Sequence, residues 1–295
     1  MLRSALLLLL ALPCLAVAAP ALNVQNDGGR VYQPVIQVPA PAEDVKALSG
    51  PDGTVCPVQP VGEGQVLVLV PGALAAGEAV TLNPSAPTEA PGTDLYVDTT
   101  DATITVGNSF LGLTFPKTGN GGMPTVFDYP VSGQTETRFE WIDRLFEKDQ
   151  GQIMLTADRK ASVAVVEEGP LQVTVESTAA YRRGDEALGN SRVVYRWTFR
   201  AYSPIVSVSA SVSREDDFAW SELHILQIAR KDDGLKNWAG EDQDVASGRL
   251  LDDKSFRGFG RWAAVDDGQN AVAIAWDGTG VTLYDGRSDY FTYLQ

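Results

Sequence analysis

The chain is poor in the residue types from which many active sites are built. Its 295 residues include one histidine, His224, and two cysteines, Cys14 and Cys56. With one histidine and no Gly-x-Ser-x-Gly sequence, a serine hydrolase triad is disfavoured, and no His/Cys cluster exists for zinc. Because no histidine lies near Cys56 in the sequence, we interpret this residue as a small buried hydrophobic side chain.

Long hydrophobic runs are also missing, since a membrane-spanning helix needs about 20 apolar residues. The apolar run at residues 5–12 is shorter, follows Arg3 and precedes a small-x-small sequence at residues 16–18. This arrangement predicts a secretory signal peptide over residues 1–18, which leaves Cys56 as the single cysteine of the mature chain. We therefore expect a secreted or periplasmic protein, with no internal disulfide and no membrane insertion of the mature chain.

Basic residues are in the minority. The chain has 23 Lys and Arg against 38 Asp and Glu, which gives a formal net charge of −15. Such a surface repels nucleic acid phosphates and anionic lipid, so neither partner is expected. The ordinary role of this charge is to keep an exported protein soluble, and a calcium requirement is the alternative.

Helical periodicity is scarce, and only residues 140–146 (EWIDRLF) have helix-like spacing. Period-two alternation is common instead, most clearly in consecutive runs at residues 171–176, 192–200 and 206–213. In the last run, the valines are expected to face the core and the serines to face water. Residues 220–228 are apolar on both faces, which predicts a central strand. Together these patterns predict an all-β protein organised around an antiparallel meander.

A stretch of prolines and small polar residues at 84–94 is typical of a semi-rigid linker. We predict a small N-terminal β-sandwich over residues 19–83 and a large antiparallel β-sandwich over residues 95–295. Residues 289–295 have the pattern of a strand that has just begun. Since an exposed apolar strand invites edge pairing, we expect either that the chain continues in a longer protein or that this end pairs with a partner.

Three stretches carry a resemblance to a known family. ITVGNSFLGLTF lies at residues 104–115, VVEEGPLQVTVESTAAY at 165–181 and VVYRWTFRAYSPIVSVSASVSR at 193–214. They resemble the large β-sandwich of galactose-mutarotase-like, carbohydrate-active bacterial proteins, and most closely secreted polysaccharide lyases of the exo-rhamnogalacturonan-lyase-like kind. The resemblance implies a supersandwich-like fold and a carbohydrate-related role, and family members continue well beyond a chain of this length. No family catalytic residue matches a position here, so none is carried over.

The first candidate binding residues form a stripe of arginines on one predicted strand: Arg192, Arg196 and Arg200. With Tyr181 placed opposite Val193, Glu176 lies diagonal to the second and third of these arginines. One interpretation is ordinary cross-strand pairing between charged side chains. The other is a polar face that grips acidic sugars through bidentate Arg–carboxylate contacts.

The sequence context of each tryptophan indicates whether it is available to bind a sugar or belongs to the core. Trp238 is expected in a polar loop, which makes it the best candidate to stack on a sugar face. Trp197 and Trp276 fall on apolar stripes instead, which is typical of core residues.

His224 is a candidate proton-transfer residue, although a packed histidine within a strand is its ordinary interpretation. If a metal is bound, Asp242 and Asp244 are the candidate ligands for calcium, because oxygen ligands clustered on a loop suit that ion. No other cofactor is expected.

We expect a carbohydrate-associated protein whose partner is a polysaccharide or oligosaccharide, acidic if the arginines bind it. The leading hypothesis is the non-catalytic front part of a polysaccharide lyase or hydrolase, or a carbohydrate-binding protein. One alternative is a polysaccharide lyase that abstracts a proton next to a uronate carboxylate, with His224 or a tyrosine as base. The other is a cell-surface structural or adhesion sandwich without enzymatic activity.

Overall fold

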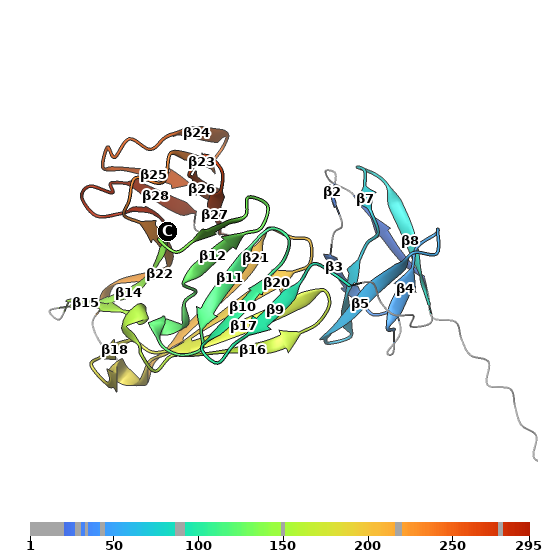
Figure 1. Cartoon of the computed structure of the whole chain (residues 1–295), viewed down its shortest axis with the longest axis horizontal. Coiled ribbons are helices and arrows are strands. Elements are labelled where there is room, and N and C mark those ends of the chain that lie inside the picture. The colour runs from blue at the N-terminus through green and yellow to red at the C-terminus, as the bar shows by residue number, and fades with distance from the viewer. Residues whose placement is uncertain are drawn as a thin grey trace, which may run out of the picture. The chain divides into compact units, whose positions relative to one another are not determined.

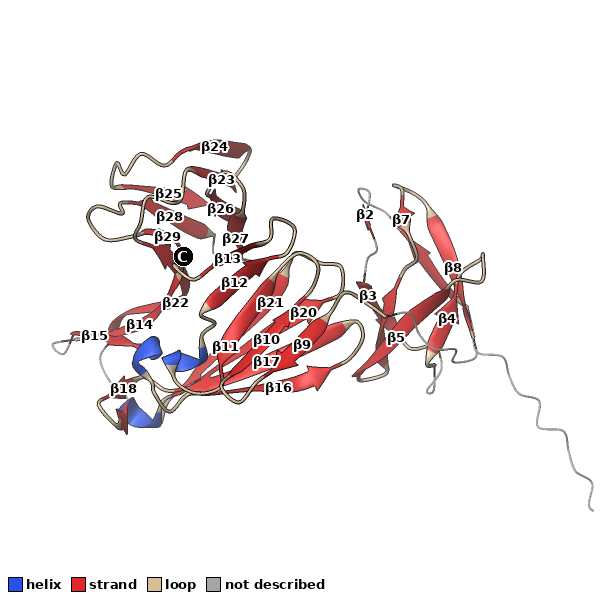
Figure 2. Ribbon diagram, viewed as in Figure 1, coloured by secondary structure: helices blue, strands red, loops and turns tan. Residues whose placement is uncertain are grey.

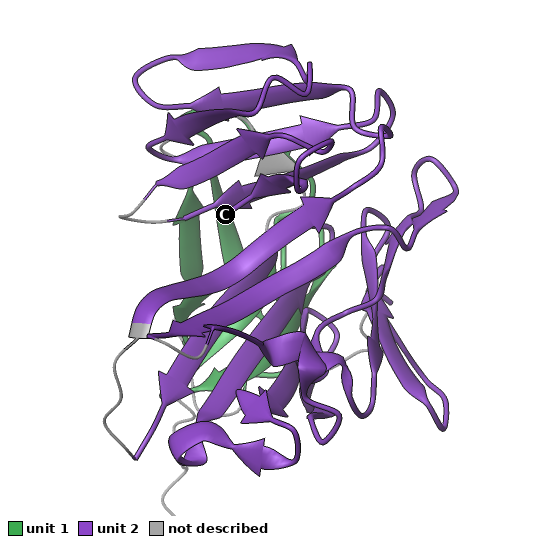
Figure 3. Ribbon diagram, turned by 90° about the vertical axis from the view of Figure 1, so that its left-hand side faces the viewer, with its two compact units in different colours: residues 1–32, 36–91 green, residues 33–35, 92–295 purple. Residues whose placement is uncertain are grey.

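The computed structural model describes residues 21–26, 31–32, 35–41, 45–85, 92–148, 151–215, 220–276 and 280–295. The predicted signal peptide and the centre of the predicted linker lie outside these residues. The chain divides into two compact units, one of residues 1–32 and 36–91 and the other of residues 33–35 and 92–295 (Figure 3). We call them unit 1 and unit 2.

Unit 1 is built from short strands separated by turns. Its strands are β1 (Leu22–Gln25), β2 (Val31–Tyr32), β3 (Val35–Pro39), β4 (Ala47–Ser49), β5 (Val55–Gly62), β6 (Gln65–Leu69), β7 (Ala73–Leu74) and β8 (Ala79–Pro84). Six of them form a sheet in the order β1-β8-β4-β5-β6-β3, and β2 pairs with β7. The core is small, and Leu48, Cys56 and Leu82 are each at most 1% exposed. Cys56 is thus a buried small side chain, as predicted, and its thiol is free.

Unit 2 is also almost entirely β-structure (Figure 2). Its strands are β9 (Tyr96–Thr99), β10 (Thr103–Gly107), β11 (Gly112–Pro116), β12 (Val126–Tyr129), β13 (Gln134–Glu136), β14 (Glu140–Glu147), β15 (Gly151–Met154), β16 (Ser162–Glu168), β17 (Gln172–Ala179), β18 (Arg182–Arg183), β19 (Glu186–Ala187), β20 (Arg192–Arg200), β21 (Val206–Ser213), β22 (Trp220–Arg230), β23 (Asn237–Glu241), β24 (Val245–Arg249), β25 (Ser255–Phe259), β26 (Trp262–Asp266), β27 (Ala271–Ala275), β28 (Val281–Asp285) and β29 (Thr292–Leu294). Single turns of 3₁₀ helix are η1 (Asn120–Gly122), η2 (Leu155–Ala157) and η3 (Leu188–Asn190). Among the described residues, no helix has the length and apolarity needed to cross a bilayer.

The strands of unit 2 form several sheets (Figure 1). The larger ones have the orders β13-β12-β11-β10-β9, β15-β14-β22-β29-β28-β25, β16-β17-β20-β21 and β24-β23-β26-β27, and β18 pairs with β19. Each described strand pairing in this unit is antiparallel, as in the meander β17-β20-β21. The predicted all-β, antiparallel fold class is confirmed.

One continuous core joins these sheets. Trp197 is 1% exposed and lies at its centre, with Phe115 at 5.6 Å and Trp141 at 5.1 Å between ring centroids. Both contacts are edge-to-face, the geometry that the aromatic quadrupole favours. These rings come from β11, β14 and β20, so the core depends on strands that are far apart in the sequence.

The central meander has the predicted strands, with one difference at its edge. Tyr195, Trp197 and Phe199 alternate into the core, each at most 1% exposed. In β21, however, every residue is either half-buried or exposed. The valines of this strand were expected to be core residues, and they are only half-buried because β21 is the last strand of its sheet.

One further local prediction needs correction, and the structure also places the final segment. Residues 140–146 form strand β14 and not a helix, because Trp141 and Ile142 are buried on its opposite faces. Burial on both faces removes the period-two signal, so a central strand can imitate helical spacing. The final segment, which was expected to continue in a longer protein or to pair with a partner, forms strand β29 between β22 and β28, with Leu294 fully buried, so both edges of this strand are paired within the chain.

Candidate functional site

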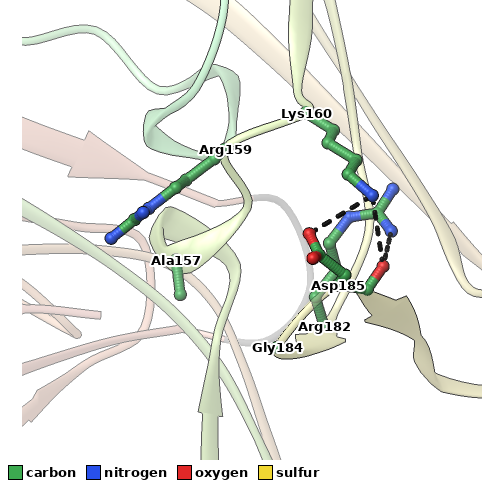
Figure 4. Close-up of a pocket in the computed structure, with 6 residues that line it drawn as sticks. All are labelled: Ala157, Arg159, Lys160, Arg182, Gly184 and Asp185. Carbon is green, nitrogen blue, oxygen red and sulfur yellow. Dashed lines mark hydrogen bonds and ion pairs between the residues drawn. The ribbon is translucent and has the colours of Figure 1, made fainter.

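The structure forms a basic pocket of about 400 Å³ in unit 2 that no sequence pattern had suggested. Its walls come from the segment between η2 and β16 and from the β18–β19 hairpin. The residues that line it are Ala157, Arg159, Lys160, Arg182, Gly184 and Asp185 (Figure 4). Lys160, Arg182 and Asp185 gather on one side of the view, and Arg159 extends on the other.

The buried side chain of Asp158 links the two segments that form the pocket through hydrogen bonds. Its side chain is 1% exposed and accepts a hydrogen bond from Arg182 Nε at 2.7 Å. It also accepts bonds from the backbone N–H groups of Lys160 and Ala180, each at 2.8 Å. A buried carboxylate needs hydrogen-bond donors to offset its desolvation, and these three donors supply them, so Asp158 joins the two segments that form the pocket.

The charges around the pocket favour an anion. Arg159, Lys160 and Arg182 contribute three cations, against two carboxylates: that of Asp185, whose side chain is 96% exposed, and that of the buried Asp158, which is paired with Arg182. Lys160 Nζ lies 3.3 Å from an Asp185 carboxylate oxygen, and Arg182 Nη1 donates to the Asp185 carbonyl at 3.0 Å. An ion pair between two exposed side chains is weak, so an incoming carboxylate can replace Asp185 at little cost. The chain as a whole has a net charge of −15, so the positive charge of this pocket is opposite in sign to that of the whole molecule.

The sequence did contain one signal for this site. Adjacent basic residues are infrequent in this acidic chain and occur at residues 159–160, 182–183 and 230–231. Both residues of the first pair and Arg182 of the second line the pocket. Their convergence depends on the β18–β19 hairpin and on Asp158, and neither had been predicted.

The arginine stripe lies on β20, in a register that differs from the expected one. Ala179, and not Tyr181, is opposite Val193, so Glu176 lies directly opposite Arg196. Arg196 Nε donates to Glu176 Oε2 at 2.9 Å, and Arg200 Nε lies 3.4 Å from Gln172 Oε1. Arg192 is exposed at the start of the same strand. The direct Glu176–Arg196 pair is what cross-strand pairing predicts, and carbohydrate binding by the stripe stays a prediction.

The tryptophans are placed differently from their sequence context. Trp238 lies on strand β23 and not in a loop, and it is half-buried beside Phe259, with ring centroids 5.7 Å apart. The guanidinium of Arg257 lies over its ring at 5.1 Å, so little of the face is open. Trp276 was expected in the core but is 39% exposed, because it follows the edge strand β27. Trp197 is a core residue, as predicted.

His224 lies on the central strand β22, near a buried carboxylate. Its Nε2 is 2.8 Å from Glu222 Oε2, and its Nδ1 is buried with no hydrogen-bond partner among the described residues. Asp143, on the neighbouring strand β14, is fully buried and accepts hydrogen bonds from the hydroxyls of Tyr181 and Tyr195. The sequence pattern correctly predicted that His224 lies on a strand. No local sequence pattern had pointed to the cluster of Asp143, Tyr181 and Tyr195.

The protonation states in this cluster follow from burial. Burial raises the pKa of Asp143 to about 6, although the two tyrosine hydrogen bonds and the charge of His224 oppose the rise. Burial and the adjacent carboxylate raise the pKa of Tyr181 and of Tyr195 well above the ordinary value. Both hydroxyls therefore stay protonated and are poor general bases.

Asp242 and Asp244 lie in the turn between β23 and β24. The backbone N–H of Asp242 donates to the Asp244 carbonyl at 3.4 Å, which is a hairpin contact. Within the described residues, no group of three or more His, Cys, Asp or Glu side chains is positioned to hold a metal ion. Calcium binding at this turn stays a prediction.

Comparisons with known proteins show similarity in fold. No family model matches the chain, and no curated protein matches it. Among solved structures, the chain is similar to an alpha-mannosidase from Enterococcus faecalis V583, with a TM-score of 0.56 and 11% sequence identity. The match covers 93% of this chain and 39% of the mannosidase chain. At this identity the likeness concerns the fold alone: the chain has an all-β architecture that also occurs within a carbohydrate-active enzyme.

Proposed function

We propose that this protein is the non-catalytic, carbohydrate-binding front part of a secreted polysaccharide lyase or hydrolase, and that it binds acidic oligosaccharides. The observation that carries the proposal is the basic pocket formed by Arg159, Lys160 and Arg182. A uronate carboxylate matches the planar guanidinium group of an arginine, and a pocket of about 400 Å³ is within the size range of small-ligand sites.

The fold similarity supports a carbohydrate context, because the alpha-mannosidase contains a comparable β-structure within a much longer chain. The lyase alternative has less support from the described residues. The Tyr181 and Tyr195 hydroxyls are buried and donate to Asp143, and both ring nitrogens of His224 face protein groups or the interior. A proton-abstracting base needs access to substrate.

The test is a binding titration with an oligogalacturonate, beside a neutral oligosaccharide of the same length. We expect the uronate to bind and the neutral sugar not to bind, with affinity falling as salt is added. Arg159→Ala removes an exposed cation that contributes no described structural contact. Because a hydrogen bond to a charged group contributes roughly 1.5–3 kcal/mol, this change should weaken binding about ten- to a hundredfold.

Arg196→Ala is the matched control, because it removes one arginine from the same unit but lies on the arginine stripe. Binding that is lost in Arg196→Ala and kept in Arg159→Ala would move the site to the stripe. Absence of uronate binding by the unmodified protein would refute the proposal. Formation of an unsaturated product that absorbs in the ultraviolet would favour the lyase instead.

A further inference from the structure

Strand β21 (Val206–Ser213) presents an open hydrogen-bonding edge. In the described part of the chain it pairs with β20 on one side and with no strand on the other. The pairing with β20 is regular over the whole strand, without a bulge. Its valines are half-buried, and its serines and Ala210 are exposed. An edge strand of this kind exposes a row of unpaired N–H and C=O groups.

The other edges of the unit 2 sheets carry features that discourage pairing. β13 has 3 residues, β9 and β15 have 4, and β24, β25 and β27 have 5. β16 is longer, but it ends in two glutamates and contains a register shift between Val165 and Glu167. β21 has 8 residues with no charge, no proline and no bulge. Short length, charge and bulges are the usual protections of an edge, and β21 has none of them.

The sequence of this strand, VSVSASVS, is self-complementary in an antiparallel pairing about Ser209. In that register Val206 faces Val212, and Val208 faces Ala210. Ser207 faces Ser211, Ser209 faces its own copy on the two-fold axis, and Ser213 faces Ile205 just beyond the strand. Apolar residues then meet on the core side of the sheet and hydroxyls meet on the outer side, which is the arrangement that specifies a register.

We propose that two copies of this chain associate through β21, in antiparallel pairing centred on Ser209, so that two four-stranded sheets become one continuous sheet. The contact is isologous, the form that a two-fold dimer requires. Apolar side chains of Val206, Val208 and Val212, half-exposed in the single chain, are covered in the pair. The proposal is independent of the carbohydrate site.

Charge and size set the strength of this association. Each chain has a net charge of −15, but β21 is uncharged and the neighbouring strand β20 carries Arg192, Arg196 and Arg200. The repulsion between copies is therefore long-range, and it is screened beyond about 8 Å at physiological salt. Interfaces below roughly 1,200 Å² are typical of weak complexes, and one pair of strands is a small contact. We expect a dimer in the micromolar range that tightens as salt is added.

The test is sedimentation analysis of the whole chain at concentrations from about 1 μM to 1 mM, the range of weak association. Ser209→Glu places a carboxylate opposite Arg196 within the chain, which the single chain accommodates. In the pair it places two carboxylates directly opposite each other, which is unfavourable. We expect dimerisation to weaken at least tenfold. Ser247→Glu, on the exposed edge strand β24, adds the same charge and should leave the dimer unchanged.

A second variant measures the register. Ser209→Cys should form an intermolecular disulfide in mild oxidant, because residue 209 alone faces its own copy and opposed residues of antiparallel strands lie within reach of a disulfide. Ser247→Cys should not, and Cys56 is buried and stays free. A monomer over the whole concentration range would overturn the proposal. A dimer that is insensitive to Ser209→Glu and not crosslinked through residue 209 would overturn it too, because another surface would then be responsible.

Discussion

Asp143 should make the stability of the protein depend on pH in a direction opposite to that of most carboxylates. Its pKa is raised from 3.8 to about 6, chiefly by burial. A carboxyl group with a raised pKa in the folded state contributes stability that is fully present below its unfolded pKa. That contribution is lost as the pH rises through the folded pKa, because folding then requires a buried charge.

The magnitude follows from the size of the shift. A change of about two pKa units corresponds to roughly 3 kcal/mol at 1.36 kcal/mol per unit. Asp143 is fully buried, so solvent screening does not reduce this figure. In Asp143→Asn the group no longer titrates. The free energy of unfolding of the unmodified protein, relative to Asp143→Asn, should therefore fall by roughly 3 kcal/mol between about pH 4 and pH 7.

The assay is urea denaturation of both proteins at a series of pH values, with the difference in free energy of unfolding plotted against pH. Tyr181→Phe supplies an internal check. Its hydroxyl donates to Asp143 and holds the carboxyl pKa down, so its removal should move the midpoint of the curve to higher pH. A difference curve that is flat between pH 4 and 7, or that rises with pH, would refute the reasoning about burial.

Two further predictions concern the core and a buried ion pair. Trp197→Ala should destabilise unit 2 by about 3–5 kcal/mol, measured by urea denaturation, because it removes a 1% exposed ring that contacts Phe115 and Trp141. A loss below about 1 kcal/mol would contradict this placement of the ring. Glu136→Gln should cost about 3 kcal/mol, measured in the same way, because it weakens the charge partner of Arg230, which is 2% exposed and donates to Glu136 at 2.8 Å. Arg230 also donates to the carboxylate of Asp232, so equal stability of the variant and the unmodified protein would show that Asp232 is a sufficient charge partner.

The local sequence pattern was sufficient wherever one face of a strand is buried and the other is wet. The alternation over residues 171–176 and 192–200 predicted β17 and β20, since a period of two follows from strand geometry alone. Residues 220–228 were recognised as a central strand for a different reason, because the run is apolar on both faces, and they form most of β22. The pattern failed at residues 140–146, where burial on both faces removes the alternation.

Register and exposure were decided by contacts between distant residues. The connection between β17 and β20 contains the β18–β19 hairpin and η3, so its length did not determine which residues face each other. The result is a direct Glu176–Arg196 pair where a diagonal one was expected. Trp276 and the valines of β21 are more exposed than their apolar spacing predicted, because spacing does not reveal which strand ends a sheet.

The sequence by itself determined the all-β class, the meander, the net charge and the shortage of catalytic residue types, because each depends on composition or on neighbours along the chain. The tertiary structure decided the basic pocket, where Lys160 and Arg182, more than twenty residues apart in the sequence, both donate hydrogen bonds to Asp158. It also decided the raised pKa of Asp143, since desolvation depends on what surrounds a carboxyl group in space. Both features arise from long-range packing, which no local spacing encodes.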